Sequence, residues 1–478
     1  MPMAADTLFY LLISALSLAG GLYGAAHALL NSRDPRSAAA WVAICLFIPF
    51  AGLLAYLAIG KNRIRTRARR LQAPAETSQS GERLALESAD AEHLIASEYR
   101  NLAYLGRAAS GNALLAGNAV EPLLNGDEAY PAMLAAIGAA RHFVHLASYI
   151  FDSHGVGAEF VAALAAARAR GVQVRVMLDG FGELYGFPRV GAALEEAGIE
   201  LRRFLPLRLF PPALGVNLRN HRKILVIDGQ EAFTGGMNIR NKHRSQADGQ
   251  PPRVLDMHFR VLGPVVQQID AVFRADWAFC GGAVPEAPDA HPVPAGDAEC
   301  RVIVDGPNED LDKLLWVLVG AIALARASIK IMTPYFLPPR ELTVALQTAA
   351  LRGVEVTVIL PASNNFGFMS WAATHSLGEL LEAGVRVGFF RGPFVHTKFF
   401  LVDDYYAHAG SSNLDPRSLR LNFEMAVEVY DQAGGRRLAA HFAASLARSS
   451  VLSLEQWRRR GLAQRLRDAF FWIFSPYL

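Results

Sequence analysis

Two eight-residue segments of the sequence share one pattern of polar and apolar residues. HRKILVID at 221–228 and HTKFFLVD at 396–403 each contain His, any residue, Lys, four apolar residues and Asp. The chain has only six lysines, so chance does not readily explain a lysine two positions after a histidine in both segments. Each segment is followed at the same distance by a glycine and an asparagine, in GGMN at 235–238 and GSSN at 410–413. The two segments are therefore predicted to be copies of one functional motif.

The residue types in this motif suit phosphate chemistry. Alternate residues of a strand point to the same face, which would place His221 beside Lys223 and His396 beside Lys398. Imidazole acts as a nucleophile and as an acid or base near neutral pH, and ammonium groups bind phosphate oxygens. The further hydrogen-bond donors expected at the phosphate are Asn238, Ser411 and Asn413.

Together these residues predict a phosphodiester site that needs no metal or other cofactor, because the lysines supply the positive charge. One histidine would attack phosphorus while the other protonates the departing alcohol, which explains why the motif occurs twice. The alternative is a duplicated structural strand, since a single histidine at a strand end is more often structural than catalytic. That alternative gives no reason for a lysine at the end of an apolar strand in both copies.

The motif lies within a longer internal repeat. Each half of the chain reads as strand, helix, strand, helix, strand, and matching segments are about 180 residues apart. This alternation predicts a duplicated α/β fold, with two similar halves packed around one active site. The matching segments are 140–151 with 325–336, 170–180 with 352–362, and 194–204 with 380–390.

Two uncharged segments near the start, 8–30 and 38–59, are each long enough to cross a membrane as a helix. A cleaved signal peptide is the alternative for the first, but residues 1–7 contain no Lys or Arg, and the second apolar segment follows almost at once. The sequence therefore predicts a transmembrane hairpin. Six basic residues in 61–70, against two in the hairpin loop, predict that the body of the protein faces the cytoplasm.

The cysteines indicate the redox compartment, and the residue composition along the chain gives the segment boundaries. Three scattered cysteines, Cys45, Cys280 and Cys300, favour neither a disulfide framework nor a metal cluster, and indicate a reducing compartment. The expected segments are the hairpin at 1–60, a basic juxtamembrane tether at 61–118, the first half at 119–280, a Pro/Gly-rich linker at 281–297, the second half at 298–450 and a basic amphipathic end at 451–478.

Three apolar segments have two interpretations each. Residues 204–216 and 364–371 form either a lipid entrance or loops that pack in the core. Residues 451–478 combine arginines with leucines and FFWIF, so they form either an interfacial membrane helix or a terminal helix docked on the second half.

The paired segments resemble the His-Lys-Asp signature of the phospholipase D superfamily. The resemblance is carried by HRKILVIDGQEAFTGGMN at 221–238 and HTKFFLVDDYYAHAGSSN at 396–413. More narrowly, the apolar hairpin and GSSNLDPRS at 410–418 are similar to bacterial cardiolipin synthases of the phospholipase D type. This resemblance covers essentially the whole chain.

The resemblance implies a role for each signature residue. His221 would form a phosphohistidine, and His396 would act as general acid and then as general base. An acidic residue would orient each histidine, Glu424 in the second half and Asp256 in the first. Lys223 and Lys398 complete the catalytic signature with Asp228 and Asp403, of which the two aspartates are expected to support the structure. Gly236 departs from the repeat, because Ser411 occupies the matching position.

The implied activity is cardiolipin synthesis in the bacterial inner membrane, from two phosphatidylglycerol molecules and with release of glycerol. Phosphatidylethanolamine or another alcohol could replace one substrate, and the oligomeric state stays open. A phospholipase D that hydrolyses lipids to phosphatidic acid is the nearest alternative. A nuclease fits the motifs but not the hairpin, so no nucleic-acid partner is expected. A non-enzymatic membrane scaffold is the alternative from another class of protein.

Overall fold

The computed structural model of the chain contains two compact units. The first unit contains the N-terminal helices, and the second contains the described residues from 91 onward. The residues that the structure describes are 2–31, 35–57, 91–206, 218–246, 249–283, 292–307 and 310–475. The predicted segments that lie wholly or largely outside these ranges are the basic stretch 61–70, the apolar segment 204–216 and the middle of the linker, 284–291.

The first unit consists of α1 (Pro2–Asn31), α2 (Pro35–Phe47) and α3 (Pro49–Ala55). Within the described residues, α1 supplies the one helix long and apolar enough to cross a membrane, Phe9–Asn31. The second predicted span, 38–59, is not one continuous helix, because α2 ends before Ile48 and α3 begins at Pro49. Proline lacks an N–H and disfavours helical geometry in the residue before it. A second spanning helix is therefore not confirmed.

Helix α1 packs very closely against its neighbours in this unit. A Cβ atom at Gly21 would lie 2.5 Å from the carbonyl oxygen of Cys45, and one at Gly24 would lie 2.9 Å from the Cys45 sulfur. The His27 ring and the Tyr56 hydroxyl also form a 2.7 Å hydrogen bond. Small residues at the contact allow the two backbones to approach, which is typical of helices that associate inside a membrane.

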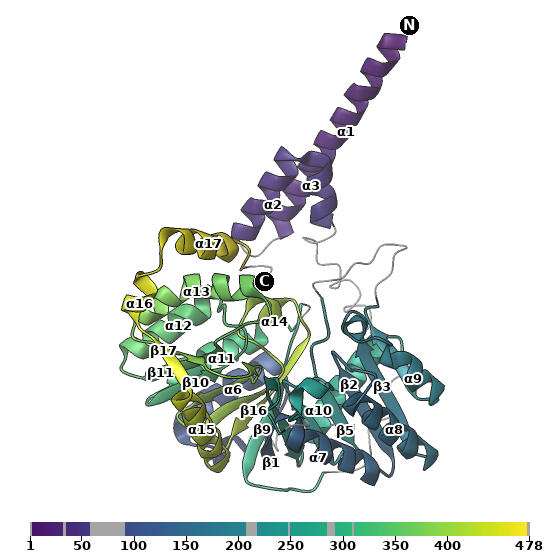
Figure 1. The fold of residues 1–478 in the computed structure, drawn as a ribbon, viewed down its shortest axis with the longest axis vertical. Helices are drawn as coiled ribbons and strands as arrows, with labels where there is room; N and C mark the ends of the chain where they lie inside the picture. Colours follow the sequence, from purple (N-terminus) through teal and green to yellow (C-terminus); the bar gives the residue numbers. More distant parts are fainter. Residues whose placement is uncertain are drawn as a thin grey trace. The chain divides into compact units, whose positions relative to one another are not determined.

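The second unit is built on one long mixed sheet, visible across Figure 1. Its strand order is β17-β12-β11-β10-β14-β15-β16-β9-β1-β8-β6-β5-β2-β3-β4. The first-half strands are β1 (Leu115–Leu124), β2 (Phe143–Ser148), β3 (Gln173–Asp179), β4 (Glu200–Phe204), β5 (Ile224–Ile227), β6 (Glu231–Gly235) and β8 (Met257–Leu262). The second-half strands are β9 (Ala298–Asp305), β10 (Ser328–Met332), β11 (Glu355–Pro361), β12 (Arg386–Phe390), β14 (Phe399–Val402), β15 (Tyr406–Gly410), β16 (Glu424–Tyr430) and β17 (Ser449–Leu452).

The two halves of this sheet repeat one arrangement outward from the antiparallel pair β1 and β9. The order β1-β8-β6-β5-β2-β3-β4 in the first half matches β9-β16-β15-β14-β10-β11-β12 in the second. In each half the last three strands of these orders, β2-β3-β4 and β10-β11-β12, are parallel, whereas the strands before them are antiparallel. In the second half, β17 adds an antiparallel edge strand beyond β12. The duplicated α/β fold is thus confirmed, although the inner antiparallel strands were not predicted.

Helices cover both faces of each half, because the strands bury alternate residues on opposite sides. In β2, Val144 and Leu146 join the core formed with α7 (Asn125–Ala139), α8 (Val156–Ala169) and α9 (Val190–Glu196). His145 points to the other face, where it contacts Asp270 of α10 (Val266–Phe279) at 2.7 Å. The second half repeats these layers with α11 (Lys313–Leu324), α12 (Arg340–Leu351) and α13 (Gly367–Glu382) on one face, and α15 (Gln432–Ala447) on the other.

The last part of the predicted tether 61–118 is folded. Helix α6 (Arg100–Ser110) and the preceding turn, η2 (Ser97–Tyr99), bury Tyr99, Leu102 and Ala103 in the core of the second half. The Tyr99 hydroxyl also donates to Asp403 at 3.1 Å. This segment therefore belongs to the structure of the second half, although it precedes the first half in the sequence.

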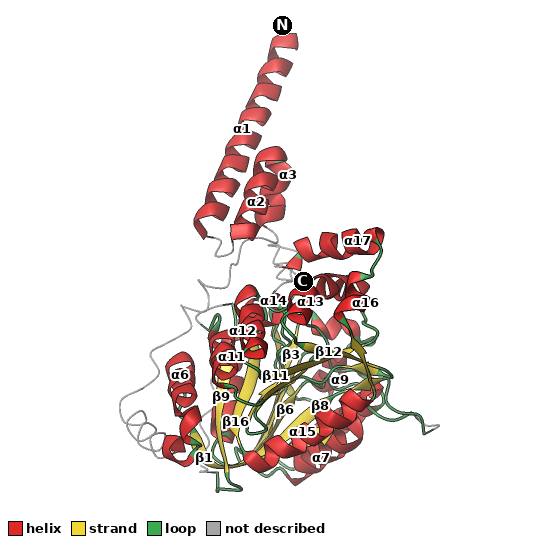
Figure 2. Ribbon diagram, turned by 90° about the vertical axis from the view of Figure 1, so that its left-hand side faces the viewer, coloured by secondary structure: helices red, strands yellow, loops and turns green. Residues whose placement is uncertain are grey.

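The C-terminal segment docks on the second half through one face of a helix. Helix α16 (Leu454–Arg458) leads into α17 (Leu462–Ile473), which lies along α13 in Figure 2. Phe471 of α17 packs on Trp371 of α13 with ring centroids 5.0 Å apart. The opposite face of α17 exposes an apolar stripe of Leu462, Leu466, Phe470 and Ile473. Docking is thus the observed arrangement, and it leaves this apolar face without a partner among the residues that the structure describes.

The two signature aspartates support the sheet, as expected. Asp228 accepts hydrogen bonds from the backbone N–H groups of Arg141, His142 and Phe143, each at 2.8 Å. Asp403 accepts three equivalent bonds from residues 326–328 at 2.7–2.9 Å. Each carboxylate therefore fixes the start of the neighbouring strand, β2 or β10.

We predict that Asp228→Ala lowers the stability of the second unit by about 1–3 kcal/mol, because three backbone donors lose a charged acceptor. Asp228 has a φ of 51°, a conformation that asparagine tolerates and alanine disfavours, so Asp228→Asn should lose less. Thermal unfolding of both variants measures the difference. An unchanged midpoint of unfolding in Asp228→Ala would contradict this structural role.

Candidate active site

Each of the two motif histidines lies just before a buried strand and is hydrogen-bonded to the opposite half of the chain. The His221 N–H donates to the Phe423 carbonyl at 2.9 Å, and the His396 N–H donates to the Leu255 carbonyl at 2.7 Å. The second contact extends a small parallel pair, β13 (Phe394–Val395) with β7 (Val254–Leu255). The backbone thus brings each histidine beside the acidic residue that follows Leu255 or Phe423.

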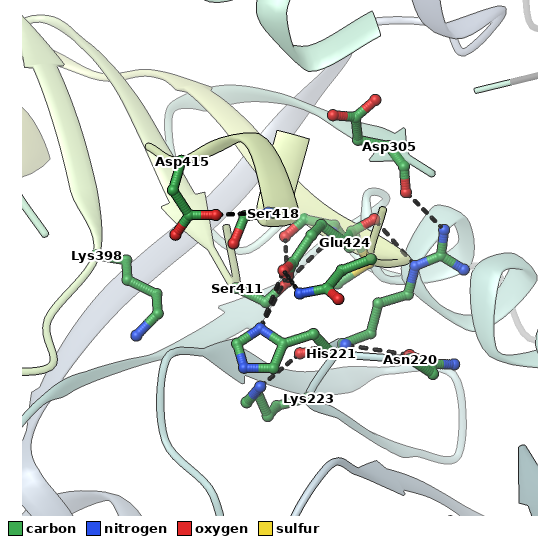
Figure 3. Close-up of polar contacts among 12 residues, drawn as sticks. Asn220, His221, Lys223, Asp305, Lys398, Ser411, Asp415, Ser418 and Glu424 are labelled. Carbon is green, nitrogen blue, oxygen red and sulfur yellow. Dashed lines mark hydrogen bonds and ion pairs between the residues drawn. The ribbon is translucent and has the colours of Figure 1, made fainter. Parts of the chain in front are cut away.

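A buried carboxylate holds the ring of each histidine. His221 Nδ1 lies 3.0 Å from Glu424 Oε1, and His396 Nδ1 lies 2.7 Å from Asp256 Oδ2. Both carboxylates are fully buried, while the two histidine side chains retain 12% and 15% exposure. A carboxylate at Nδ1 keeps the proton on that nitrogen, so Nε2 carries the lone pair. Figure 3 shows the His221 ring directed at Glu424.

The pairing of acids and histidines crosses between the two halves. Asp256 follows the first motif in sequence but contacts His396 of the second, while Glu424 of the second half contacts His221 of the first. The sequence assigned one acid to each half, but in the structure each acid contacts the histidine of the other half. Neither half therefore contains both a motif histidine and the carboxylate that contacts it.

Ser411 does not lie where a phosphate ligand would contact it. Its hydroxyl is fully buried and donates to Glu424, and it accepts from the Met425 N–H at 3.1 Å. Asn422 Nδ2 also donates to Glu424, at 3.1 Å. The role that this arrangement supports for Ser411 is to hold Glu424, in place of the predicted phosphate contact.

The matching position in the first half has no room for a side chain. A Cβ atom at Gly236 would lie 2.4 Å from Asp256 Oδ1. Asp256 instead accepts from the Met257 N–H at 2.8 Å. The longer side chain of Glu424 thus packs beside a serine, whereas the shorter side chain of Asp256 packs beside a glycine.

The two motif asparagines, Asn238 and Asn413, are buried and differ in the contacts of their side-chain oxygens. Asn238 accepts from the Ile150 N–H at 3.0 Å through its oxygen, which directs its amide nitrogen elsewhere. Asn413 is 6% exposed, and its side-chain oxygen has no partner among the residues that the structure describes. Both amide groups lie on segments that adjoin the histidine pairs.

The two lysines are buried against the histidines. Lys223 Nζ donates to the His221 carbonyl at 2.5 Å, and Lys398 Nζ donates to the His396 carbonyl at 2.6 Å. Lys398 Nζ also lies 3.2 Å from His396 Nε2. Burial lowers the pKa of Lys223 to about 7 and that of Lys398 to about 8. The site therefore concentrates cations that are poorly hydrated.

Burial also decides the charge of the remaining groups. It lowers the pKa of His221, and it lowers that of His396 well below its usual value, with Lys398 as the next cause. Burial raises the pKa of Asp256, whereas His221 and Lys223 outweigh burial at Glu424 and hold its pKa below the usual value. His221 is therefore a neutral imidazole beside an anionic carboxylate, which is the state required of a nucleophile.

The sequence analysis missed two groups around His221. The Tyr149 ring packs edge-on against the His221 ring, with centroids 5.1 Å apart, and Lys223 Nζ lies 5.5 Å from the Tyr149 ring centroid. Asn422, which bonds Glu424, was the second omission. The signal for Asn422 was its place two residues before Glu424, because side chains two apart share one face of an extended segment.

Two family descriptions match this chain. A family described as "Cardiolipin synthase, PLD-like domain" matches residues 133–277 and 318–448, and a phospholipase D-nuclease N-terminal family matches residues 22–61. Cardiolipin synthase A of Serratia proteamaculans is 34% identical over 98% of this chain and 97% of its own length. Cardiolipin synthase A of Yersinia pseudotuberculosis is 33% identical over 99% of this chain and its own full length.

A solved structure with low sequence identity shares the fold. The crystal structure of phosphatidylserine synthase from Haemophilus influenzae is 16% identical, with a TM-score of 0.60 over 79% of this chain and all of that chain. The two segments that match the cardiolipin synthase description lie one in each half of the sheet, and the similarity to the two relatives extends over 98–99% of this chain. The chain belongs to the phospholipase D-like family of cardiolipin synthases.

Proposed function

We propose that this protein transfers a phosphatidyl group from one phosphatidylglycerol to the glycerol hydroxyl of another, which yields cardiolipin and glycerol. The observation that carries the proposal is the crossed pair of histidine–carboxylate contacts beside two buried lysines. This set of groups provides a nucleophile, an acid or base and two cations at one phosphodiester. Full-length similarity to cardiolipin synthases supports the choice of lipid substrates.

In the first step, Nε2 of His221 attacks the phosphorus of the donor lipid. The bond from phosphorus to the glycerol headgroup breaks, and His396 gives a proton to the departing alkoxide. The bound phosphodiester favours the protonated form of His396, because an opposite charge raises the pKa of a base. Lys223 and Lys398, with the amides of Asn238 and Asn413, stabilise the charge on the phosphate oxygens.

In the second step, the hydroxyl of the acceptor lipid gives its proton to His396 and attacks the same phosphorus. The bond between phosphorus and His221 breaks, cardiolipin leaves, and both histidines return to their starting states. One phosphodiester replaces another, so the reaction stores little free energy and is reversible. Water in place of the acceptor would give phosphatidic acid, so the site must favour the lipid alcohol over water.

The membrane arrangement that we propose is a hairpin in the bacterial inner membrane, with the catalytic unit in the cytoplasm. Phe9–Asn31 would form one span, and α2 with α3 would return as a kinked second span packed on Gly21 and Gly24. The basic residues at 61–70 support the cytoplasmic orientation through the positive-inside rule.

The exposed stripe of α17 would rest on the same lipid surface. Arg465 lies next to Leu466 of this stripe. It is exposed and has no carboxylate partner in the described part of the chain. An apolar face beside arginine suits a membrane rich in anionic lipid. Contact of α17 with the membrane would bring the catalytic unit to its substrates.

We predict that His221→Ala and His396→Ala each reduce cardiolipin formation by about three orders of magnitude or more, since each removes a group that acts in the transition state. Mass spectrometry of phosphatidylglycerol vesicles with the full chain measures the products. His154→Ala, at an exposed histidine outside the site, is the matched control.

The same variants test which histidine attacks. After an acid quench, lipid labelled on phosphorus should leave label on the wild-type protein and none on His221→Ala. Label that persists in His221→Ala would make the assignment of the nucleophile wrong. Phosphatidic acid as the sole product of the wild type would overturn the synthase in favour of a hydrolase.

We predict that kcat/KM for the donor lipid falls as the pH rises through about 7 to 8. A lysine is charged below its pKa, and the free enzyme loses the charges of Lys223 and Lys398 in this interval. The acidic limb should lie below pH 6.5, because burial lowers the pKa of His221. Micelles of neutral detergent keep the surface pH equal to the bulk pH. Lys223→Arg should move the alkaline limb upward, because Lys223 has the lower pKa of the two lysines, and an unmoved limb would exclude Lys223 as its cause.

We predict that a fluorophore on Leu466→Cys or Phe470→Cys is quenched by nitroxide-labelled lipid when the full chain is in vesicles. The matched control is Leu351→Cys, at a leucine that is 76% exposed on α12. Labelled wild-type protein corrects for Cys45, Cys280 and Cys300. Equal quenching at α17 and at the control would contradict membrane contact by α17.

A further inference from the structure

A short turn beside the second histidine carries two polar residues that the reaction steps above do not use. The turn is η4 (Asn241–His243), which follows the first-half asparagine, Asn238, by a few residues. The ring centroids of His243 and His396 are 6.4 Å apart. Burial is the main cause that lowers the pKa of His396 and of Lys398, and the charge of Lys242 contributes to both shifts. Lys242 and His243 therefore border the site on the His396 side.

Lys242 differs from Lys313 and Lys330, the two described lysines outside the site. Lys313 pairs with Asp310 at 2.7 Å, and Lys330 pairs with Asp404 at 2.6 Å. Lys242 is half-buried and has no carboxylate within ion-pair distance among the described residues. Burial lowers the pKa of Lys242, with Arg240 as the next cause. Asp256 and Asp152 act on Lys242 only from beyond ion-pair distance. A partly desolvated cation with no direct carboxylate contact is suited to an anionic ligand.

His243 is an unpartnered imidazole inside the protein. It is 1% exposed, and both ring nitrogens lack a hydrogen-bond partner among the residues that the structure describes. Burial lowers its pKa well below the usual value, so the ring is neutral and offers one donor and one acceptor. Buried polar groups normally have partners, and this pair of nitrogens matches the donor and acceptor of an alcohol hydroxyl.

The second half lacks the same combination. Counted from the motif asparagine, Arg417 occupies the position of Lys242, and Ser418 occupies that of His243. Ser418 has a different task, because its N–H donates to the Asp415 carboxylate at 2.7 Å at the start of α14 (Pro416–Arg420). The extra imidazole is thus confined to the neighbourhood of His396, the residue that handles the proton of the alcohol.

We propose that Lys242 and His243 bind the headgroup of the acceptor lipid, with Lys242 on its phosphate and His243 on a glycerol hydroxyl. This inference rests on the proposed function, in which the acceptor is itself a phosphodiester with free hydroxyls. The two contacts would hold the attacking hydroxyl beside His396. Water and free glycerol lack the phosphate, so Lys242 would favour the lipid acceptor over both.

The test compares two acceptors for one phosphoenzyme. Full-length protein in vesicles of phosphatidylglycerol and neutral phosphatidylcholine receives labelled glycerol, and both cardiolipin and labelled phosphatidylglycerol are measured. In Lys242→Met the ratio of cardiolipin formation to glycerol exchange should fall about tenfold, the effect expected from loss of one charged hydrogen bond. Lys330→Met, at a lysine paired with Asp404, should leave the ratio unchanged.

His243→Phe keeps the ring and removes both nitrogens, so it should reduce transfer to either alcohol and raise the share of phosphatidic acid. His243→Gln restores a donor and an acceptor and should recover part of the lost transfer. Thermal unfolding of each variant separates loss of transfer from loss of folding.

Three results would each overturn either the acceptor site or the proposed function. A cardiolipin-to-exchange ratio in Lys242→Met equal to that of the wild type overturns the acceptor site while leaving the proposed function intact. An equal loss of cardiolipin, exchange and phosphatidic acid in both variants also overturns it, because the residues would then serve the first step. Absence of cardiolipin with the wild-type protein would instead overturn the proposed function.

Discussion

The crossed contacts between histidines and carboxylates are the constraint on which the rest of the molecule depends. His221 reaches across to Glu424, and His396 reaches across to Asp256, so the active site exists only while the two halves are held together. The central strands β1 and β9 and the backbone bonds from His221 to Phe423 and from His396 to Leu255 maintain this contact. Burial of both acids strengthens these pairs, because water does not compete with the histidine for a buried carboxylate.

The same arrangement explains how a nearly symmetric repeat can divide two chemical roles. Glu424 accepts side-chain hydrogen bonds from His221, Ser411 and Asn422, which favour its anionic form. Asp256, beside Gly236, has a raised pKa, chiefly because of burial. A firmly anionic partner makes an imidazole the better nucleophile, whereas a carboxyl group with a raised pKa suits a histidine that gives and takes a proton. The asymmetry therefore favours attack by His221 and acid–base catalysis by His396.

Much of this could be predicted from the sequence, because the repeat places the same residue types at the same spacing. The duplicated α/β fold and the position of each histidine follow from local pattern, and the supporting role of Asp228 was implied by the family resemblance. The crossing of the acids could not be predicted, because His221 and Glu424 are 203 residues apart and their contact is set by the packing of two halves. The break at Ile48 had a local signal in Pro49, which the long apolar segment obscured.

The two buried lysines of the site have no carboxylate in ion-pair contact among the described residues, and this bears on how the protein favours lipids over water. Lys223 and Lys398 are buried and donate hydrogen bonds to backbone carbonyls. Burial destabilises the charged form of each lysine. A phosphodiester supplies the missing anion and stabilises both cations, whereas a water molecule cannot. Binding of lipid phosphate therefore favours the protonated form of both lysines. An acceptor alcohol that carries a second phosphate is attracted by the same positive charges. Selection of the acceptor then follows from the electrostatics that activate the donor.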